Sequence, residues 1–169
     1  MSEHSPHSGS AETALAAKIK LLEAELASLK QQQQQMTDRD TRHQYAMEAT
    51  NDGLWDWHIP SGKIYFNHSY LRMLGYDYGD LPADLHTLRE YFVHTDDVDD
   101  VLTEYQTALD NRRESVQLQY RLLHRDGNSI WVHAKAKFFE PDSQGRATRC
   151  VGINSDISDF IKAREDLLG

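Results

Sequence analysis

Hydrophobic and polar residues alternate on both sides of a short turn within residues 116–139. The turn contains Asp126, Gly127 and Asn128. The alternating hydrophobic positions are Val116, Leu118, Tyr120, Leu122, Ile130, Val132, Ala134, Ala136 and Phe138. A period of two on either side of a glycine-containing turn predicts a β-hairpin. The opposite face of the second arm mixes aromatic residues with lysines, so we expect both faces of the sheet to be partly covered.

A second pattern, with alternating spacings of four and three residues, runs through the N-terminal part of the chain. Its members form the predicted dimer seam: Leu15, Ile19, Leu22, Leu26 and Leu29. This spacing is typical of a coiled coil, and it favours self-association over an amphipathic helix packed on its own domain. We expect a helix over residues 12–48. Residues 1–11 are mostly polar and are expected to form a disordered tail, because they offer too little apolar surface to offset the entropy of ordering.

The remaining segments alternate between short strands and helices. Asn67 or Ser69 is expected to cap the short helix over residues 70–74, and Gly75 to end it. A helix over residues 97–109 opens with acidic residues, which suit the positive end of the helix dipole. The other expected elements are strands at 54–59, 63–66 and 147–154, an irregular or short helical connection at 81–93, and a helix at 157–168.

Charge and composition narrow the class of protein. The chain has 18 basic and 27 acidic residues, which gives a net charge of −9. An acidic surface argues against nucleic acid or an anionic membrane as the main partner. A single cysteine, Cys150, excludes an internal disulfide, and no apolar run is long enough for a membrane span or a signal peptide. We therefore expect a cytoplasmic protein.

Eight short segments, in order, carry a resemblance to a known family. They are residues 51–57 (NDGLWDW), 74–76 (LGY), 94–97 (HTDD), 120–122 (YRL), 125–127 (RDG), 130–132 (IWV), Gly152 and 156–158 (DIS). Their order and spacing resemble a PAS domain with its C-terminal PAC portion, a sensor module of bacterial signalling proteins. The resemblance implies an α+β fold over residues 49–158, in which a five-stranded antiparallel sheet carries helices on one face. Residues 159–169 would begin a C-terminal signalling helix.

The same resemblance implies a small ligand cavity on the concave face of the sheet. The candidate lining residues are Trp57, Tyr65, Tyr70, Phe92, Leu102, Leu118, Tyr120, Val132 and Ile153. The alternative is that these residues simply fill the core. The cofactor is unknown: a flavin adduct would require a cysteine in a helix, and Cys150 lies on the last predicted strand. Haem members of the family commonly carry an axial histidine on the long helix, and residues 97–109 contain none, although His86 and His94 just before that helix could in principle reach a haem. We therefore expect neither haem nor flavin. The aspartates at 96–100 are explained by a helix start, and we expect no metal site.

The closing triplet of the resemblance, Asp156, Ile157 and Ser158, implies a signal junction between the last strand and the exit helix. We expect Asp156 to pair with Arg121, and the Ser158 hydroxyl to cap the exit helix. The alternative is a plain helix cap without a signalling role.

Three functions remain open, and none is enzymatic, because the sequence has no nucleophile elbow, phosphate-binding glycine loop or His-Glu metal motif. The first is a homodimeric input module that relays a ligand or partner signal through its flanking helices to an effector. The second is a ligand-free domain for dimerisation or protein interaction. The third is a haem or flavin sensor.

Overall fold

The computed structural model of the protein describes residues 7–169, which divide into two compact units at Ala46 and Met47. The first unit is formed by helix α1 (His7–Thr50), whose last residues belong to the second unit. The helix begins inside the stretch 1–11 that the sequence predicts as a tail, so that prediction is wrong for residues 7–11; the rest of the stretch lies outside the described residues. Extending a helix by a few residues costs little once the alanine-rich segment after Gly9 has formed it.

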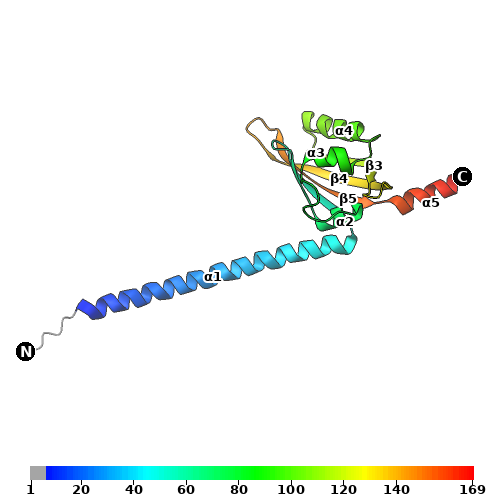
Figure 1. Cartoon of the computed structure of the whole chain (residues 1–169). Coiled ribbons are helices and arrows are strands. Elements are labelled where there is room, and N and C mark those ends of the chain that lie inside the picture. The colour runs from blue at the N-terminus through cyan, green and yellow to red at the C-terminus, as the bar shows by residue number, and fades with distance from the viewer. Residues whose placement is uncertain (1–6) are drawn as a thin grey trace, which may run out of the picture. The chain divides into compact units, whose positions relative to one another are not determined.

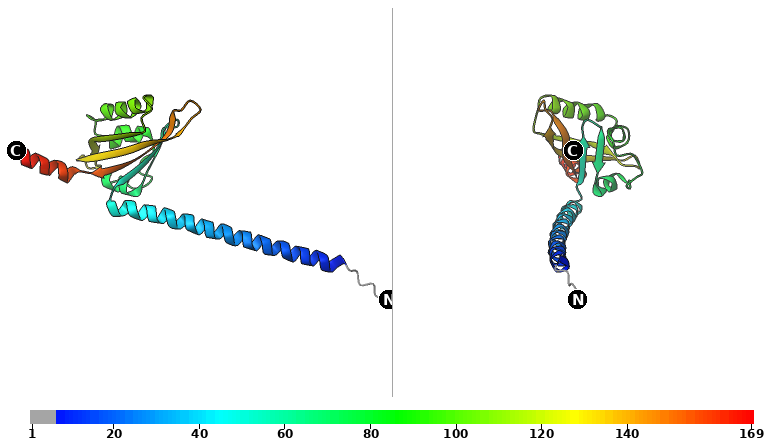
Figure 2. Two further views of the ribbon diagram at one scale, coloured as in Figure 1. Left: turned by 180° about the vertical axis from the view of Figure 1, so that it is seen from behind. Right: turned by 90° about the vertical axis from the view of Figure 1, so that its left-hand side faces the viewer.

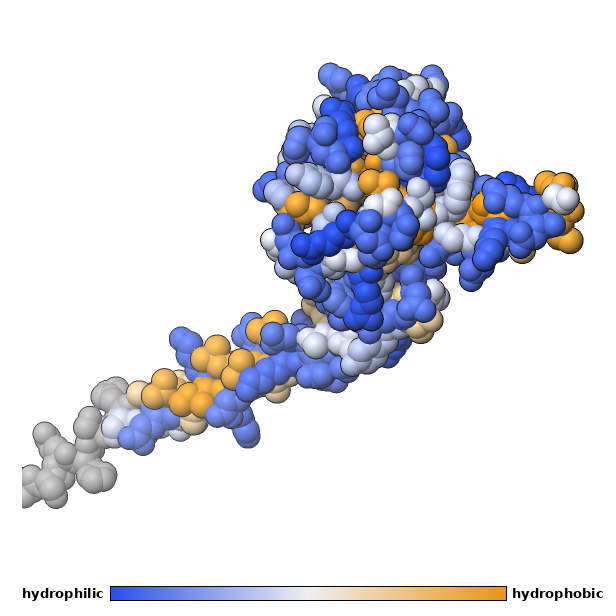
Figure 3. All heavy atoms as spheres, turned by 45° about the vertical axis from the view of Figure 1, so that its right-hand side comes forward, coloured by the Kyte–Doolittle hydropathy of each residue, from blue (hydrophilic) through white to orange (hydrophobic). Residues whose placement is uncertain are grey.

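Helix α1 keeps its apolar stripe exposed. The side chains of the predicted dimer seam are 48–59% exposed, and they are Leu15, Ile19, Leu22, Leu26 and Leu29. Figure 3 shows hydrophobic side chains gathered along this helix. Leu21, which lies off the seam, is 72% exposed. None of the helices in the described part of the chain is long and apolar enough to cross a membrane.

The second unit is built on a five-stranded antiparallel sheet with the strand order β2-β1-β5-β4-β3. The strands are β1 (Gly53–His58), β2 (Lys63–Phe66), β3 (Ser115–Leu123), β4 (Ser129–Pro141) and β5 (Ala147–Asp156). The predicted hairpin is formed by β3 and β4, in which Tyr120 lies opposite Val132. Because side chains alternate between faces, this register places the whole predicted hydrophobic set on one face.

Helices cover that inner face of the sheet, as Figures 1 and 2 show. They are α2 (His68–Leu74), α3 (Leu85–Thr87), the π-helical turn η1 (Leu88–Phe92) and α4 (Val98–Asp110). Asn67 caps α2 by accepting a hydrogen bond from the Tyr70 amide, and Gly75 ends it in the left-handed conformation at φ 83°. Helix α5 (Ser158–Leu168) follows β5 and buries Ile161.

The core lies between the inner face and these helices. Phe66, Tyr70, Tyr76 and Phe92 form a cluster of aromatic rings with centroids 4.7–5.8 Å apart. Such ring pairs add to the stabilisation from burial alone. The predicted α+β fold with a long N-terminal helix and a short C-terminal helix is confirmed.

Candidate ligand cavity and signal junction

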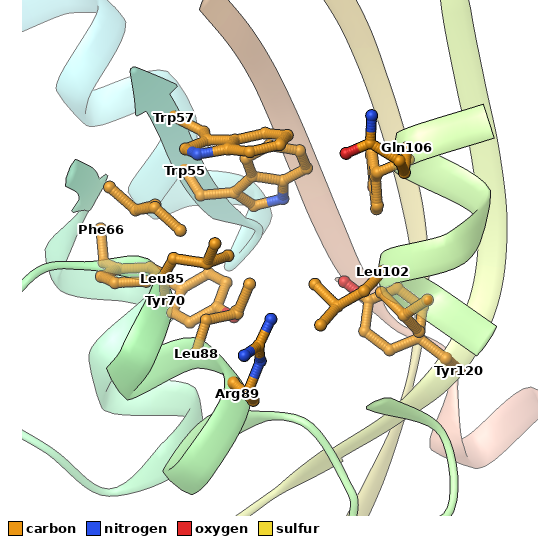
Figure 4. Close-up of a pocket in the computed structure, with 13 residues that line it drawn as sticks. Trp55, Trp57, Phe66, Tyr70, Leu85, Leu88, Arg89, Leu102, Gln106 and Tyr120 are labelled. Carbon is orange, nitrogen blue, oxygen red and sulfur yellow. The ribbon is translucent and has the colours of Figure 1, made fainter. Parts of the chain in front are cut away.

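A cavity of about 130 Å³ lies between the inner face of the sheet and helices η1 and α4. It is lined by Trp55, Trp57, Ile64, Phe66, Tyr70, Leu85, Leu88, Arg89, Val101, Leu102, Tyr105, Gln106 and Tyr120. Figure 4 shows the two tryptophans of β1 on one side of the cavity and Leu102 and Gln106 of α4 on the other. The walls are mainly aromatic and aliphatic, which suits a small ligand with an apolar body.

The structure brings four of the nine predicted lining residues to the cavity: Trp57, Tyr70, Leu102 and Tyr120. Phe92 and Val132 are buried in the core but do not line it, and Leu118 faces a shallow groove beside Asp97.

Two of the predicted lining residues, Tyr65 and Ile153, lie on the opposite face of the sheet. The assignment of these two residues to the cavity is corrected: their neighbours Ile64 and Asn154 point inward, so strand alternation turns Tyr65 and Ile153 outward. They are 54% and 36% exposed.

Sequence reasoning missed the polar residues of the cavity, above all Arg89 and Gln106. Arg89 belongs to η1, in a segment whose pattern indicates only an irregular connection, and Gln106 lies on the polar side of α4. Neither residue carries a periodic signal, because both are exposed at the edge of the cavity. Only the approach of η1 to α4 brings them together.

A chain of hydrogen bonds crosses the floor of the cavity. The Trp55 indole Nε1–H donates to Asn154 Oδ1 at 2.8 Å, and Asn154 Nδ2 donates to the Tyr120 hydroxyl at 3.3 Å. Asn154 is fully buried, and a buried amide needs such partners. The Trp55 indole also lies directly against Gly152 of β5, where a Cβ atom would overlap the ring. The absence of a side chain at Gly152 therefore sets the position of Trp55.

Three polar groups beside the cavity have no hydrogen-bond partner among the described residues. They are the hydroxyls of Tyr70 and Tyr105 and the indole Nε1–H of Trp57. Tyr70 is 1% and Tyr105 is 6% exposed, and burial raises the pKa of both phenols well above 10. Both phenols are thus neutral at physiological pH and keep a proton to donate. An unpaired buried hydroxyl costs free energy, so these groups lower the stability of the ligand-free domain.

Cys150 lies on β5, fully buried on the inner face of the sheet. Burial raises the pKa of its thiol to about 12, with a smaller contribution from the nearby Asp56 carboxylate. Cys150 is therefore a protonated, weakly nucleophilic thiol.

The two histidines considered for haem do not line the cavity. His86 is exposed on α3. His94 Nδ1 accepts a hydrogen bond from the Asp96 amide at 3.1 Å, next to the start of α4. In the part of the chain that the structure describes, no group of three or more His, Cys, Asp or Glu residues is arranged to hold a metal ion.

The signal junction contains an ion pair that differs from the expected one. Arg121 does not bind Asp156; instead its Nε and Nη2 donate to the Asp97 carboxylate at 3.0 and 2.8 Å. The Arg121 amide also donates to Asp97 at 2.9 Å. These hydrogen bonds hold the pKa of the Asp97 carboxyl below its usual 3.8. The correction has a geometric reason: Asp97 starts α4 beside β3, whereas Asp156 lies at the end of β5 and is exposed.

The exit helix is joined to β4 by two further hydrogen bonds. The Trp131 amide donates to the Ser158 hydroxyl at 3.2 Å, and the Ile157 amide donates to the Trp131 carbonyl at 2.9 Å. The expected capping role of Ser158 is thus corrected, because its hydroxyl accepts from the strand. Asp156 Oδ1 accepts from the Ser158 amide at 2.9 Å and satisfies the start of α5. The Arg121 guanidinium lies 5.5 Å from the Trp131 ring centroid, which links the ion pair to this junction.

The fold, the order of its strands and its short motifs define a sensor-type domain of signalling proteins. The family described as the PAS fold matches residues 63–154, which is more than half of the 169 residues, and the protein belongs to this family. The resemblance seen in the sequence is confirmed.

Several relatives are signalling proteins. A blue-light-activated histidine kinase from Brucella anthropi is 26% identical over 151 residues, which span 88% of this chain but 28% of the kinase. A crystal structure of a sensory box histidine kinase/response regulator from Burkholderia thailandensis is similar with a TM-score of 0.62 and 27% identity, over 75% of this chain and 92% of that one. The N-terminal domain of a diguanylate cyclase with PAS/PAC sensor from Marinobacter aquaeolei shares the fold, with a TM-score of 0.57, 20% identity, and coverage of 64% and 97%.

Proposed function

We propose that the protein is a non-catalytic input module of bacterial signal transduction, which senses a small molecule in the cavity beneath α4. The observation that carries this proposal is the pair of buried, unpartnered hydroxyls of Tyr70 and Tyr105 beside a cavity of about 130 Å³. A domain that only filled its core would be expected to pair or omit these groups. The similarity to parts of sensor kinases supports the same function.

The signal travels from the cavity to the exit helix through the junction residues. Helix α4 contributes Val101, Leu102 and Tyr105 to the cavity, and it begins next to Asp97. Asp97 holds Arg121, which lies over Trp131, and the backbone of Trp131 binds the start of α5. A ligand that moves α4 therefore changes the ion pair, and the ion pair changes the angle at which α5 leaves the sheet.

The module acts as a parallel homodimer held by the dimer seam of α1. Five aliphatic side chains at coiled-coil spacing remain about half exposed, which is a large apolar stripe for a single helix. Pairing with a second copy buries this stripe and gives the two domains a common axis. The output then passes to an effector domain or a partner signalling protein in the cytoplasm, without nucleic acid or a membrane as the partner.

Native mass spectrometry of the purified chain tests the sensing function, together with an absorbance scan. We expect a dimer whose native mass exceeds that of two denatured chains by the mass of a bound small molecule. An empty dimer would contradict ligand sensing and support the second function, a ligand-free interaction domain. The exposed dimer seam by itself favours this alternative, because dimerisation needs no cavity.

The same scan tests the haem and flavin alternative, since both groups absorb visible light. We do not expect a flavin adduct on Cys150. Cys150 lies on β5 rather than in a helix, and its pKa of about 12 leaves the thiol protonated.

A further inference from the structure

Two of the polar groups around the cavity can only donate hydrogen bonds. The phenols of Tyr70 and Tyr105 and the indole Nε1–H of Trp57 are buried without partners among the described residues. An indole N–H can only donate, and a guanidinium, such as that of Arg89 in the cavity wall, can only donate as well. A ligand that binds the Arg89 guanidinium must present hydrogen-bond acceptors.

Arg89 adds a positive charge to this donor set. Figure 4 shows its side chain among the residues that line the cavity. Within residues 7–169, no carboxylate forms an ion pair with Arg89 and no hydrogen bond satisfies its guanidinium. Two other arginines at the sheet are paired in place: Arg121 with Asp97, and Arg149 with Asp56 and Glu140. An unpaired guanidinium beside an aromatic cavity is thus a binding group for an anion.

The rest of the cavity sets the size and shape of the ligand body. Its volume of about 130 Å³ is close to that of an apolar protein cavity that admits one benzene ring. Trp55, Phe66 and Tyr120 supply faces and edges for ring packing. Because Arg89 and Gln106 are exposed at the rim, the ring enters first and the charged end stays near the opening.

We propose that the cavity binds a small aromatic carboxylic acid, with the ring among the tryptophans and tyrosines and the carboxylate on Arg89. This inference rests on the proposed sensing function and names its ligand class. The carboxylate accepts from the Arg89 guanidinium at the rim. A neutral aromatic compound of the same shape fills the cavity but leaves Arg89 unpaired, so it binds more weakly.

Titration of the full chain with three probes tests this ligand class: phenylacetate, its neutral analogue phenylacetamide, and acetate, which has no ring. Calorimetry and the fluorescence of Trp55 and Trp57 follow binding. We expect phenylacetate to bind about tenfold more tightly than phenylacetamide, as one charge-assisted hydrogen-bond pair would give, and acetate not to bind at millimolar concentration. Equal affinity for the acid and the amide, or no binding of phenylacetate at millimolar concentration, would overturn the proposal.

Two variants locate the interaction. Arg89→Gln should abolish the preference for the acid, whereas Arg72→Gln, on the exposed side of α2 and outside the cavity, should retain it. Tyr70→Phe removes an unpaired buried hydroxyl away from the opening, so the ligand-free protein should melt at the same or a higher temperature and keep its preference for the acid. A Tyr70→Phe protein that binds phenylacetate and phenylacetamide equally well would count against a carboxylate held by Arg89 at the opening.

Native mass spectrometry separates this proposal from the sensing function on which it rests. A retained molecule that lacks a carboxylate would leave sensing in place and overturn the aromatic acid. A retained aromatic acid would support both.

Discussion

Arg121 binds both oxygens of the Asp97 carboxylate, at 2.8 and 3.0 Å, and so ties the start of α4 to the middle of β3. The same arginine lies over the ring of Trp131, whose backbone holds the start of α5. One ion pair therefore connects the helix that lines the cavity with the helix that leaves the domain. This arrangement is the physical basis for the proposed relay.

The Asp97 ion pair should make stability sensitive to acid. The pKa of Asp97 lies below 3.8 in the folded protein and near 3.8 in the unfolded chain, so the carboxylate stabilises the fold fully above pH 3.8. This stabilisation is lost as the pH falls from there through the lower, folded pKa. In urea unfolding across this range, Asp97→Asn should be less stable than the wild type at neutral pH, and the difference should shrink in acid.

Asp99→Asn is the matched control for this prediction, because Asp99 is an exposed carboxylate in the first turn of the same helix. Asp99 forms no ion pair within residues 7–169, so this substitution should leave the Asp97–Arg121 pair and its loss in acid in place. A difference between Asp97→Asn and the wild type that stays constant down to the lowest pH would argue against the ion pair as its cause.

Gly152→Ala should destabilise the domain, because the added Cβ would overlap the Trp55 indole. Overpacking of this kind typically costs about 1–3 kcal/mol in the free energy of unfolding. Thermal or urea unfolding measures the change. In a Trp55→Phe background the indole atoms that oppose the Cβ are absent, so the same glycine substitution should cost less; an equal cost in both backgrounds would contradict the proposed clash.

Asn154→Leu should also destabilise, by leaving the buried Trp55 Nε1–H without its acceptor at 2.8 Å. An unsatisfied buried donor costs about 1–3 kcal/mol. Tyr120→Phe removes only the acceptor of the longer 3.3 Å bond and should cost less in the same unfolding measurement. A larger loss of stability in Tyr120→Phe than in Asn154→Leu would contradict this prediction, because the Trp55–Asn154 bond is expected to contribute more than the Asn154–Tyr120 bond.

Cys150 should react slowly with iodoacetamide in the native protein. Its pKa of about 12, against an ordinary 9.0, means that almost no thiolate exists at pH 8, and burial blocks the reagent. We expect alkylation, followed by mass spectrometry, to be more than about tenfold faster in denaturant than in buffer. Equal rates would place the thiol at the surface.

The dimer seam should determine the oligomeric state. Leu22→Asn combined with Leu26→Asn places two polar side chains in the seam and should yield a monomer by light scattering. Leu21→Asn is the matched control: Leu21 is 72% exposed and lies off the seam, so the dimer should persist. A dimer that survives the double substitution would mean that another surface holds the two copies together.

Some elements of this fold could be predicted from the sequence, because local features determine them: an alternating hydrophobic face or a helix cap. The long alternation through β3 and β4 shows which residues share a face, because nine consecutive paired positions leave one consistent arrangement. Asn67 and Gly75 mark the ends of α2 through hydrogen bonds and a left-handed backbone that involve only near neighbours. The rest of the topology could be predicted from the order of the short motifs that the chain shares with the PAS family.

The side chains of the cavity and the junction depended on contacts between segments far apart in the chain. Strand β2 is too short for its alternation to show which of its faces is buried. The orientation of Tyr65 therefore follows only from the structure, in which Ile64 packs inward. The sequence analysis offered Asp156 as the partner of Arg121, and only the position of α4 beside β3 shows that the partner is Asp97.

By itself, therefore, the sequence determined the strand and helix pattern, the acidic surface and the coiled-coil spacing of α1, because these depend on periodicity and composition along the chain. The tertiary structure alone decided that Arg89 from η1 and two unpartnered tyrosines from α2 and α4 share one cavity. The reason is physical: which polar groups lose their water and which of them find partners depends on how distant segments pack.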